Sequence, residues 1–378
     1  MRDLQEIRQE INEIDEQLLE LFIKRMNCAR DVGIYKKENN IPIFNAEREQ
    51  EILDGMLSRG GAYGYAAQLL YTNIMELSRA LQHNIVGSGK EIRKEITNAA
   101  KKLRYDRKTR IATQGLPGAN NHEATKIVFP NCNPMFHRDF KSVFKAIENG
   151  EADYGILPVE NSSAGSVVDV YDLILEHRFY IVKSVDLPIN HNLCCIPQSD
   201  IKYIEEVWSH PQALAQCSDK ISEANYRTVQ SANTAIAARD VAISKRIDIA
   251  AICNESAANE YGLKILKKNI SNRADNTTRF IVISKKLVIP ENSDKISLCF
   301  SIPHKTGSLY SVLGRFNSIG LNLTKIESRP MNNAPFEYLF YLDFAGSVKD
   351  DNVLNLLCAL SEELPEFSFL GNYNEEFV

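Results

Sequence analysis

The first 87 residues carry apolar side chains at helical spacing. One apolar seam, in which separations of three and four residues alternate, consists of Leu4, Ile7, Ile11, Ile14, Leu18 and Leu21. This is the spacing of a coiled coil. Two asparagines and a proline at 39–42 end the first helix, and further helices are predicted from Asn45 and from about 65 to 82. A first helix of roughly 35 residues is too long for two shorter helices to cover. We therefore expect it to pair with a second copy of the chain in an intertwined dimer.

From Arg110 onward, short β-type runs alternate with helical segments. The predicted strands are 111–113, 154–157, 179–182, 207–208, 249–252 and 280–283, and two of the helices are 233–244 and 254–261. This alternation indicates an α/β domain.

The last stretch, 293–378, has a βαββαβ pattern. Its predicted elements are a strand at 296–302, a helix at 309–320, strands at 321–328 and 336–344, a helix around 354–360 and a strand near 367–370. This is the ferredoxin-like arrangement. The sequence thus predicts a multi-domain chain with a helical domain at 1–87, a basic linker at 88–108, an α/β domain at 109–286 and a ferredoxin-like domain at 293–378.

Composition narrows the possible functions of this 378-residue chain. A formal charge of −5 argues against nucleic acid or an anionic membrane as the main partner. The segment 88–108 is basic, with eight Lys/Arg against three Asp/Glu, and we interpret it as a solvated linker helix. No apolar run approaches the roughly 20 residues of a membrane helix, and the N-terminus opens with charges. The eight cysteines show no C-x-x-C spacing, so we expect a reduced, cytoplasmic protein without a zinc site.

Cationic residues of the helical region could bind a small dianion. Arg25 and Lys36 are eleven residues apart, which places them within about 20° of the same helix face and roughly 16 Å apart. Arg8 lies roughly 25 Å further back, so it could reach the same ligand only from a partner chain. Taken alone, each of these charges is better explained as an ordinary surface charge on a long helix.

Several segments together resemble the all-helical class of chorismate mutase. They are Ile7-Arg8 through Leu18, Arg25, residues 32–36 (Val-Gly-Ile-Tyr-Lys), 45–49 (Asn-Ala-Glu-Arg-Glu) and 76–82 (Glu-Leu-Ser-Arg-Ala-Leu-Gln). The resemblance implies that Arg8 of the partner, Arg25 and Arg48 bind the carboxylates of chorismate, and that Lys36 and Gln82 face its ether oxygen. It also implies that Glu49 holds the ring hydroxyl, that Ser78 lines the pocket, and that Asn45, where the family usually has aspartate, alters affinity without abolishing activity. The rearrangement to prephenate needs no general base, because a cation placed where charge develops on the ether oxygen suffices.

Polar clusters follow the β-type runs of the α/β region, where open sheets bind ligands. The clusters are 114–119 (Gln-Gly-Leu-Pro-Gly-Ala), 160–165 (Glu-Asn-Ser-Ser-Ala-Gly), 209–213 (Ser-His-Pro-Gln-Ala) and 276–280 (Asn-Thr-Thr-Arg-Phe). Each can also be a helix cap or a turn. The glycine loop is neither G-x-G-x-x-G nor a Walker A motif, and the absence of G-x-S-x-G makes His210 a pocket residue rather than a member of a hydrolase triad.

These clusters in this order resemble prephenate dehydratase over about 109–286. The resemblance implies two α/β subdomains with the site in their cleft, the chain crossing near 185–195 and returning near 275. It implies that Thr278 donates a hydrogen bond to the departing hydroxide and that Arg279 binds a substrate carboxylate. The other implied substrate-binding residues are Asn161, Ser162, His210, Gln212 and Phe280. Residues 119–122 (Ala-Asn-Asn-His) depart from the family pattern, which puts substrate contacts from that loop in doubt.

The C-terminal region resembles an ACT domain, an amino-acid sensor. The resemblance rests on 307–310 (Gly-Ser-Leu-Tyr) and 327–330 (Glu-Ser-Arg-Pro). It implies that phenylalanine binds between two such domains and regulates activity, with contacts from Gly307, Ser308, Leu309, Asn322, Glu327, Ser328 and Arg329. A purely structural dimerisation domain is the alternative.

The sequence therefore predicts an enzyme of phenylalanine biosynthesis that converts chorismate to prephenate and prephenate to phenylpyruvate. We expect a homodimer or homotetramer that needs no metal or other cofactor. Two alternatives remain: a dehydratase that prefers arogenate and has a weakened mutase, and a non-catalytic two-lobed protein that binds a small molecule.

Overall fold

The computed structural model describes residues 2–331 and 334–378. The chain forms two compact units, and each is described by itself. The first unit comprises Met1–Asn98 and Ile296–Phe369, and the second comprises Ala99–Lys295 and Leu370–Val378.

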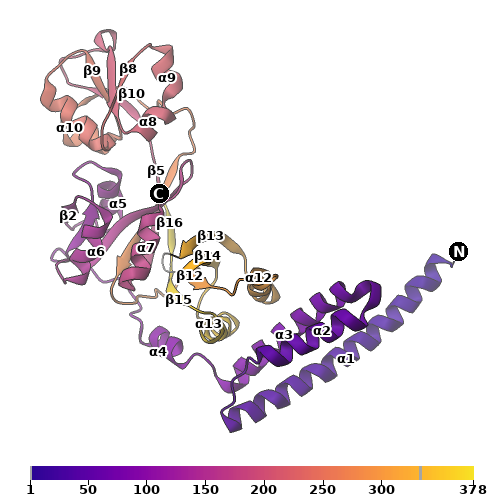
Figure 1. Cartoon of the computed structure of the whole chain (residues 1–378). Coiled ribbons are helices and arrows are strands. Elements are labelled where there is room, and N and C mark those ends of the chain that lie inside the picture. Colours follow the sequence, from indigo (N-terminus) through magenta and orange to yellow (C-terminus); the bar gives the residue numbers. More distant parts are fainter. Residues whose placement is uncertain (1, 332–333) are drawn as a thin grey trace. The chain divides into compact units, whose positions relative to one another are not determined.

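The first unit begins with four helices and a short 3-10 turn (Figure 1). They are α1 (Leu4–Asn39), α2 (Ala46–Arg59), the 3-10 turn η1 (Gly61–Tyr63), α3 (Gly64–Val86) and α4 (Lys90–Asn98). The Asp3 side chain caps α1, which ends where Asn40 adopts a left-handed conformation with φ of 52°. The first three helices match the predicted ones. Helix α4 lies in the predicted linker, but it is not fully solvated, because Ile92 and Ile96 are buried.

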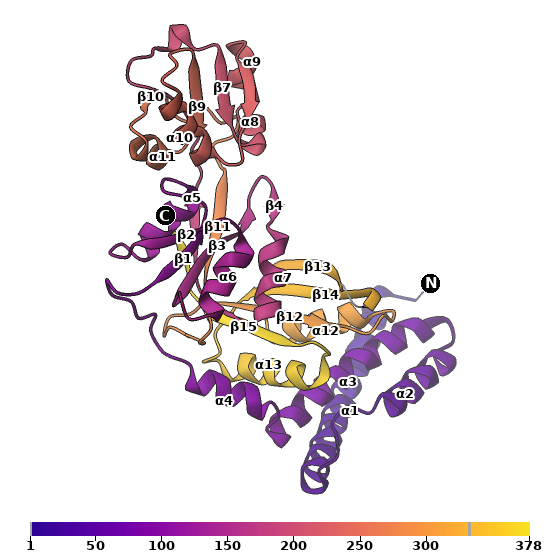
Figure 2. The ribbon, with the colours of Figure 1, turned by 60° about the vertical axis from the view of Figure 1, so that its left-hand side comes forward.

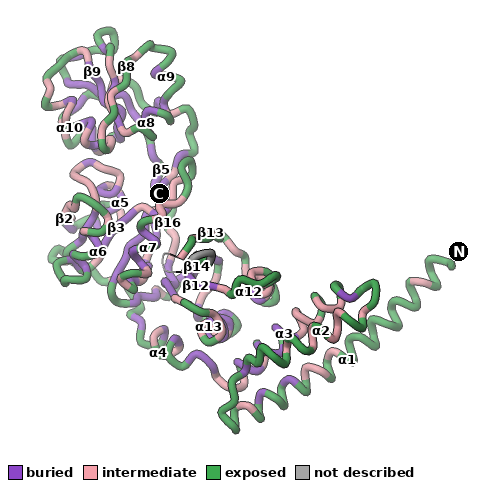
Figure 3. Tube along the Cα trace, in the orientation of Figure 1, coloured by how far each residue is buried: buried purple, intermediate pink, exposed green. Residues whose placement is uncertain are grey.

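The apolar seam of α1 is exposed on the single chain. Leu4, Ile14 and Leu21 are 58%, 47% and 61% exposed, and only Ala29 and Gly33 of this helix are buried. Figure 3 shows the mostly exposed surface along α1, and in Figure 1 its N-terminal turns extend past α2 and α3.

The rest of the first unit is a four-stranded sheet, in which β13 and β14 pair antiparallel, with two helices. The order along the chain is β12 (Lys295–Ser301), α12 (Ser308–Ser318), β13 (Leu323–Met331), β14 (Ala334–Ala345), α13 (Asp351–Glu363) and β15 (Ser368–Tyr373). The strand order is β13-β14-β12-β15, and Figure 2 shows both helices on one face of the sheet. The predicted βαββαβ order is thus present.

The second unit contains two sheets. A seven-stranded sheet has the order β16-β5-β11-β3-β1-β2, with β4 paired to β3, and a five-stranded sheet has the order β10-β6-β9-β7-β8. The strands of the first sheet are β1 (Ile111–Gln114), β2 (Pro134–His137), β3 (Tyr154–Asn161), β4 (Gly165–Ser166), β5 (Tyr180–Pro188), β11 (Thr277–Ser284) and β16 (Glu375–Phe377). Those of the second are β6 (Asn192–Cys195), β7 (Glu206–Ser209), β8 (Arg227–Gln230), β9 (Ile249–Cys253) and β10 (Lys264–Lys267).

Helices cover both sheets and define two subdomains. The seven-stranded sheet carries α5 (Asn120–Val128), α6 (Phe140–Glu148) and α7 (Val168–His177). The five-stranded sheet carries η2 (Ile201–Tyr203), α8 (Pro211–Gln216), α9 (Ser218–Glu223), α10 (Thr234–Ser244) and α11 (Glu255–Glu260). The chain crosses between β5 and β6 and returns between β10 and β11, as predicted. Among the described helices, none combines the length and apolar character that a bilayer crossing demands.

Candidate functional sites

Helices α1 and α3 bring three predicted mutase residues together. Arg25 on α1 donates through Nη1 to the hydroxyl of Ser78 on α3 at 2.8 Å, and Ser78 is buried. A Cβ at Gly33 would lie 3.2 Å from Cγ of Gln82, so the glycine allows α1 to approach α3 closely. Gln82 is 7% exposed, and its Oε1 has no hydrogen-bond partner among the described residues. Since buried amides are normally hydrogen-bonded, this oxygen is a candidate acceptor for a bound ligand.

Lys36 and Asn45 lie where the chain turns from α1 into α2. Lys36 donates through Nζ to the carbonyl of Ile43. Burial lowers the pKa of Lys36 and the charge of Arg79 lowers it further, while Glu49 opposes both. Asn45 accepts from the backbone N–H of Arg48 at 3.0 Å and so caps α2. An uncharged asparagine performs this capping as well as aspartate does.

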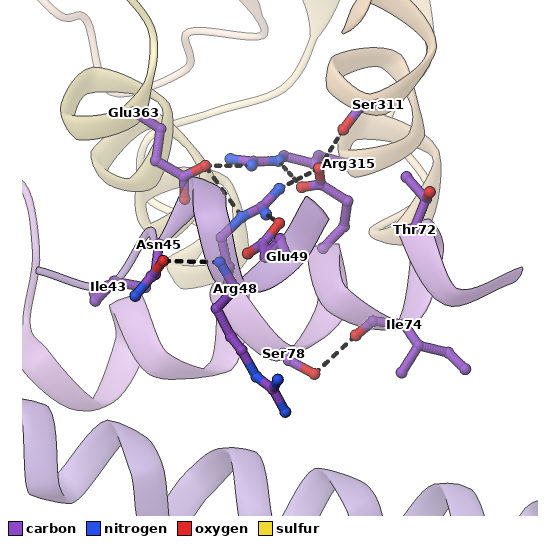
Figure 4. Close-up of polar contacts among 12 residues, drawn as sticks. Ile43, Asn45, Arg48, Glu49, Thr72, Ile74, Ser78, Ser311, Arg315 and Glu363 are labelled. Atoms are coloured by element: carbon purple, nitrogen blue, oxygen red, sulfur yellow. Dashed lines mark hydrogen bonds and ion pairs between the residues drawn. The ribbon is translucent and has the colours of Figure 1, made fainter. Parts of the chain in front are cut away.

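The remaining mutase candidates divide into one internal and two exposed residues. The Glu49 side chain is only 21% exposed (Figure 4) and forms an ion pair with Arg79. The sequence analysis did not select Arg79 as a site residue. Arg48 is exposed and pairs with Glu51. Arg8 is exposed on the part of α1 that extends past the other helices. The structure of one chain thus joins Arg25 to Ser78, brings Gln82 beside α1 at Gly33 and places Glu49 near enough to Lys36 to affect its pKa, and it leaves Arg8 and Arg48 exposed.

In the second unit, Thr278 and Asn161 lie opposite each other on β11 and β3. The Asn161 amide donates to the Thr278 hydroxyl at 2.9 Å and to Oδ1 of Asn276 at 2.8 Å. Ser162 is tied to the adjacent backbone, because its hydroxyl donates to the carbonyl of Asp275 at 3.1 Å and accepts from the N–H of Thr277 at 3.0 Å. Asn161 and Thr278 therefore form the polar centre of this site.

The five-stranded subdomain contributes His210 and Gln212 from the start of α8. His210 caps this helix by accepting from the N–H of Gln212, and burial lowers the pKa of His210. Gln212 Nε2 lies 3.5 Å from Oδ1 of Asn161, across the two subdomains. The predicted residues of the two subdomains thus meet at Asn161.

Two predicted substrate-binding residues are already engaged within the protein. Arg279 contacts Asp186 through two hydrogen bonds of 2.9 Å, Glu375 at 2.6 Å and Glu160 at 3.4 Å. Burial alone would lower the pKa of Arg279, but the hydrogen bonds to Asp186 and the charges of Glu375 and Glu160 raise it above its ordinary value. Phe280 is 1% exposed and packs in the core of the seven-stranded subdomain, so we do not carry it into the site.

Sequence reasoning missed a buried polar chain beside Asn161. Asn276 donates to Gln216 Oε1 at 3.1 Å, and the same oxygen lies 2.9 Å from Nε2 of His191. Burial lowers the pKa of His191. Asn276 adjoins the Thr-Thr-Arg-Phe motif and could have been selected, whereas nothing in the sequence marks Gln216 or His191.

The loop that departs from the family pattern holds the two subdomains together. Gly118 has φ of +83°, and a Cβ there would lie 2.7 Å from Cα of Ala257. Asn254 donates to Asn120 at 2.8 Å, and His122 accepts from the N–H of Gly118 at 3.0 Å. These polar residues therefore have structural partners in this chain.

The predicted regulatory residues separate into two groups. Gly307, Ser308 and Leu309 line a cavity of about 530 Å³ at the start of α12, together with Tyr338 and Phe340. Asn322 precedes the edge strand β13, and Glu327, Ser328 and Arg329 lie along it; none of these four is among the described residues that line this cavity. Nε of Arg329 is buried and has no hydrogen-bond partner among the described residues. Nowhere in the described part of the chain do three or more His, Cys, Asp and Glu side chains form a group that could hold a metal.

Comparison with known proteins assigns the N-terminal helical region and the α/β region to families. The family profile described as chorismate mutase type II matches residues 7–83, and that described as prephenate dehydratase matches residues 111–287. A bifunctional chorismate mutase/prephenate dehydratase from Aquifex aeolicus is 34% identical over 377 residues, which cover 99% of this chain and 98% of that protein. Arogenate dehydratase/prephenate dehydratase 1 from Arabidopsis thaliana is 38% identical over 289 residues, covering 72% of this chain and 74% of that protein.

Among solved structures, a prephenate dehydratase from Arthrobacter aurescens in complex with L-Phe superimposes with a TM-score of 0.65 at 29% identity. The match covers 70% of this chain and 89% of that chain. The chain belongs to the bifunctional chorismate mutase/prephenate dehydratase family and carries both activities in the biosynthesis of phenylalanine.

Proposed function

We propose that the mutase site lies between α1 and α3 and binds chorismate through Arg25 and Lys36. One observation carries the proposal: each of these cations contacts a neutral oxygen, that of Ser78 or Ile43, and neither forms an ion pair with a described residue. A dianionic substrate can therefore take up their charge without displacing a protein carboxylate. Gln82 adds a buried polar group from α3, whose Oε1 has no hydrogen-bond partner among the described residues.

Lys36 has the electrostatic role in the rearrangement. The reaction is intramolecular and moves no proton, so holding the reactive conformer and stabilising the charge on the ether oxygen account for catalysis. In the free protein Lys36 donates to the Ile43 carbonyl, and on binding its Nζ turns to the ether oxygen beside the Gln82 amide. Glu49 accepts a hydrogen bond from the hydroxyl group on the ring of chorismate.

A second copy of the chain completes this site with Arg8. The exposed seam on α1 supports pairing with another α1, because apolar side chains at coiled-coil spacing are stabilised by burial. Arg8 lies roughly 25 Å from Arg25 along α1, so it serves the pocket of the partner.

Thr278 assists departure of hydroxide from prephenate in the second unit. Because Asn161 donates to the Thr278 oxygen, the hydrogen of that hydroxyl remains available to the leaving group. Loss of carbon dioxide supplies the electron pair that makes the ring aromatic as hydroxide departs. Arg279 can bind the substrate carboxylate only by exchanging a protein carboxylate, and Glu160, at 3.4 Å, is its longest contact.

The βαββαβ domain acts as an ACT domain that senses phenylalanine. The cavity beside Gly307, Ser308 and Leu309 at the N-terminus of α12 supports this, because backbone N–H groups there suit a carboxylate. The L-Phe complex of the Arthrobacter aurescens enzyme supports the same ligand.

Supplying chorismate to the purified protein tests these proposals together. We expect prephenate to rise and then fall as phenylpyruvate forms, and added phenylalanine to slow phenylpyruvate formation. A rate that phenylalanine leaves unchanged would exclude the regulatory role. Parallel assays with prephenate and arogenate decide between the two dehydratase substrates, and a higher kcat/KM for arogenate would favour the alternative.

A further inference from the structure

A buried cluster of charged side chains connects the mutase helices with the C-terminal helices of the first unit (Figure 4). Helix α3 contributes Glu76, Arg79 and His83, helix α12 contributes Ser311 and Arg315, helix α13 contributes Glu363, and helix α2 contributes Glu49. Apart from His83, two arginines face three glutamates, so these five side chains carry a formal charge of −1.

Arg79 is the centre of this cluster, and three carboxylates occupy its guanidinium. Nη1 pairs with Glu49, Nη2 pairs with Glu76, and Nε lies 3.3 Å from Oε2 of Glu363. The ring of Phe44 lies 5.1 Å from the guanidinium carbon, and the Arg79 side chain is 8% exposed. Both Nη atoms are thus engaged by carboxylates, whereas Nε lies at ion-pair distance from Glu363 without making a hydrogen bond to any described residue.

Glu363 is held in turn from three sides. Its carboxylate contacts His83, Arg315 and Arg79, and its side chain is 7% exposed. Burial alone would raise the pKa of Glu363, but the His83 hydrogen bond and the charges of Arg315 and Arg79 lower it to about 2. Glu363 therefore stays ionised and keeps a negative charge against Arg79.

We propose that Arg79 is a positioning residue of the mutase site, and that Glu363 of α13 holds Arg79 so that Arg79 can orient Glu49. This inference rests on the proposed role of Glu49 as acceptor of the substrate's ring hydroxyl. The C-terminal domain would thereby affect chorismate binding through Glu363, although Glu363 itself does not contact the substrate. Loss of Glu363 removes the negative charge that faces Nε of Arg79 and lets the guanidinium turn, which releases the constraint on Glu49.

The test is a double-mutant cycle in the full-length protein between Glu363→Gln and Glu49→Gln. We expect Glu363→Gln to raise the mutase KM for chorismate about tenfold and to change kcat less than about threefold, because an interaction made in both the bound and the transition state is weakened. In the double variant the two effects should not add, since Glu363 acts through Glu49. A fully additive double variant, or an unchanged KM in Glu363→Gln, would overturn the inference.

Controls separate this inference from the role of Glu49 and from misfolding. Glu362→Gln is the matched control. Glu362 is the neighbouring residue on α13, is 45% exposed, lies 3.6 Å from His83 and accepts from the N–H of Gly89, but it forms no ion pair with Arg79 among the described contacts. The KM of this variant should stay at the wild-type value. An unchanged KM in Glu49→Gln would show that the role of Glu49 is wrong, whatever Glu363 does. Arg79→Lys keeps the positive charge but loses the planar guanidinium. It can replace Glu363→Gln in the double-mutant cycle with Glu49→Gln, so the inference remains testable if Glu363→Gln does not fold.

Discussion

Replacing Thr278 by valine removes one hydroxyl and leaves the shape of the side chain nearly unchanged. Thr278 is 9% exposed on β11, and its oxygen accepts from the Asn161 amide at 2.9 Å. That amide also donates to Asn276 at 2.8 Å, so the substitution does not leave it without an acceptor. The free energy of unfolding should therefore fall by only about 1 kcal/mol, the net contribution of one hydrogen bond.

The effect on catalysis should be much larger than the effect on stability. A hydrogen-bond donor aimed at charge that develops in the transition state contributes about 3 to 4 kcal/mol. We therefore expect Thr278→Val to lower the dehydratase kcat about 10²–10³-fold while the KM for prephenate changes little.

The assay follows phenylpyruvate formed from prephenate by its ultraviolet absorbance in alkali. Thr278→Ser restores a hydroxyl at the same position and should recover most of the rate, and mutase turnover measured on the same samples confirms that the variants fold. A Thr278→Val enzyme with a kcat within threefold of wild type would refute the argument that this hydroxyl assists the departure of hydroxide.

Lys36→Ala should lower mutase kcat by about 10²-fold or more without changing dehydratase kcat, because one electrostatic donor is lost from one site alone; equal loss in both assays would point to unfolding instead. For Glu363, whose pKa falls from the ordinary 4.5 to about 2 on folding, the ionised form contributes about 3 kcal/mol of stability above pH 4.5, which is lost as pH falls towards 2. Urea unfolding at several pH values should show this loss, and Glu363→Gln should make the curve flatter. Gly118→Ala should cost at least about 1–2 kcal/mol, because φ is +83° and the new Cβ would meet the Ala257 backbone at 2.7 Å; a thermal midpoint equal to wild type would contradict the close approach of the subdomains.

The periodic parts of the fold were predictable, and buried short strands such as β1 and β7 were found as well, but short exposed strands were not. Six residues at alternating spacing specify α1, whose bounds are Leu4–Asn39, because long amphipathic repeats carry the strongest local signal. Strands such as β8 (Arg227–Gln230) and β10 (Lys264–Lys267) have four residues each, and no residue of either is fully buried. The C-terminal strand β16 pairs with β5, far away in sequence, and local patterns contain no information on such pairing.

Candidate site residues were found where they belonged to a motif, and missed where only tertiary contacts give them a role. Arg79 stands inside the quoted segment 76–82, yet nothing local distinguishes it from a surface charge. Its partner Glu363 comes from a helix of another domain, and the neighbouring pair of Glu76 and Arg315 is separated by 239 residues. The same limit applies to Arg279, whose sequence motif does not reveal that three carboxylates already surround it.

The partners of each arginine or lysine distinguish cations that bind substrate from cations that hold the protein together. Arg79 and Arg279 each face three carboxylates, so an anionic substrate would have to compete with negative charge at either one. Arg25 and Lys36 contact a hydroxyl and a carbonyl, which a substrate carboxylate or ether oxygen can replace at little electrostatic cost. Arg79 and Arg279 each receive one carboxylate from the C-terminal part of the chain: Glu363 contacts Arg79 in the first unit, and Glu375 contacts Arg279 in the second. The C-terminal part therefore contributes to the rigidity of both proposed catalytic regions. In the proposed mutase site, chorismate therefore meets two cations, Arg25 and Lys36, that form no ion pair with a carboxylate of the described residues.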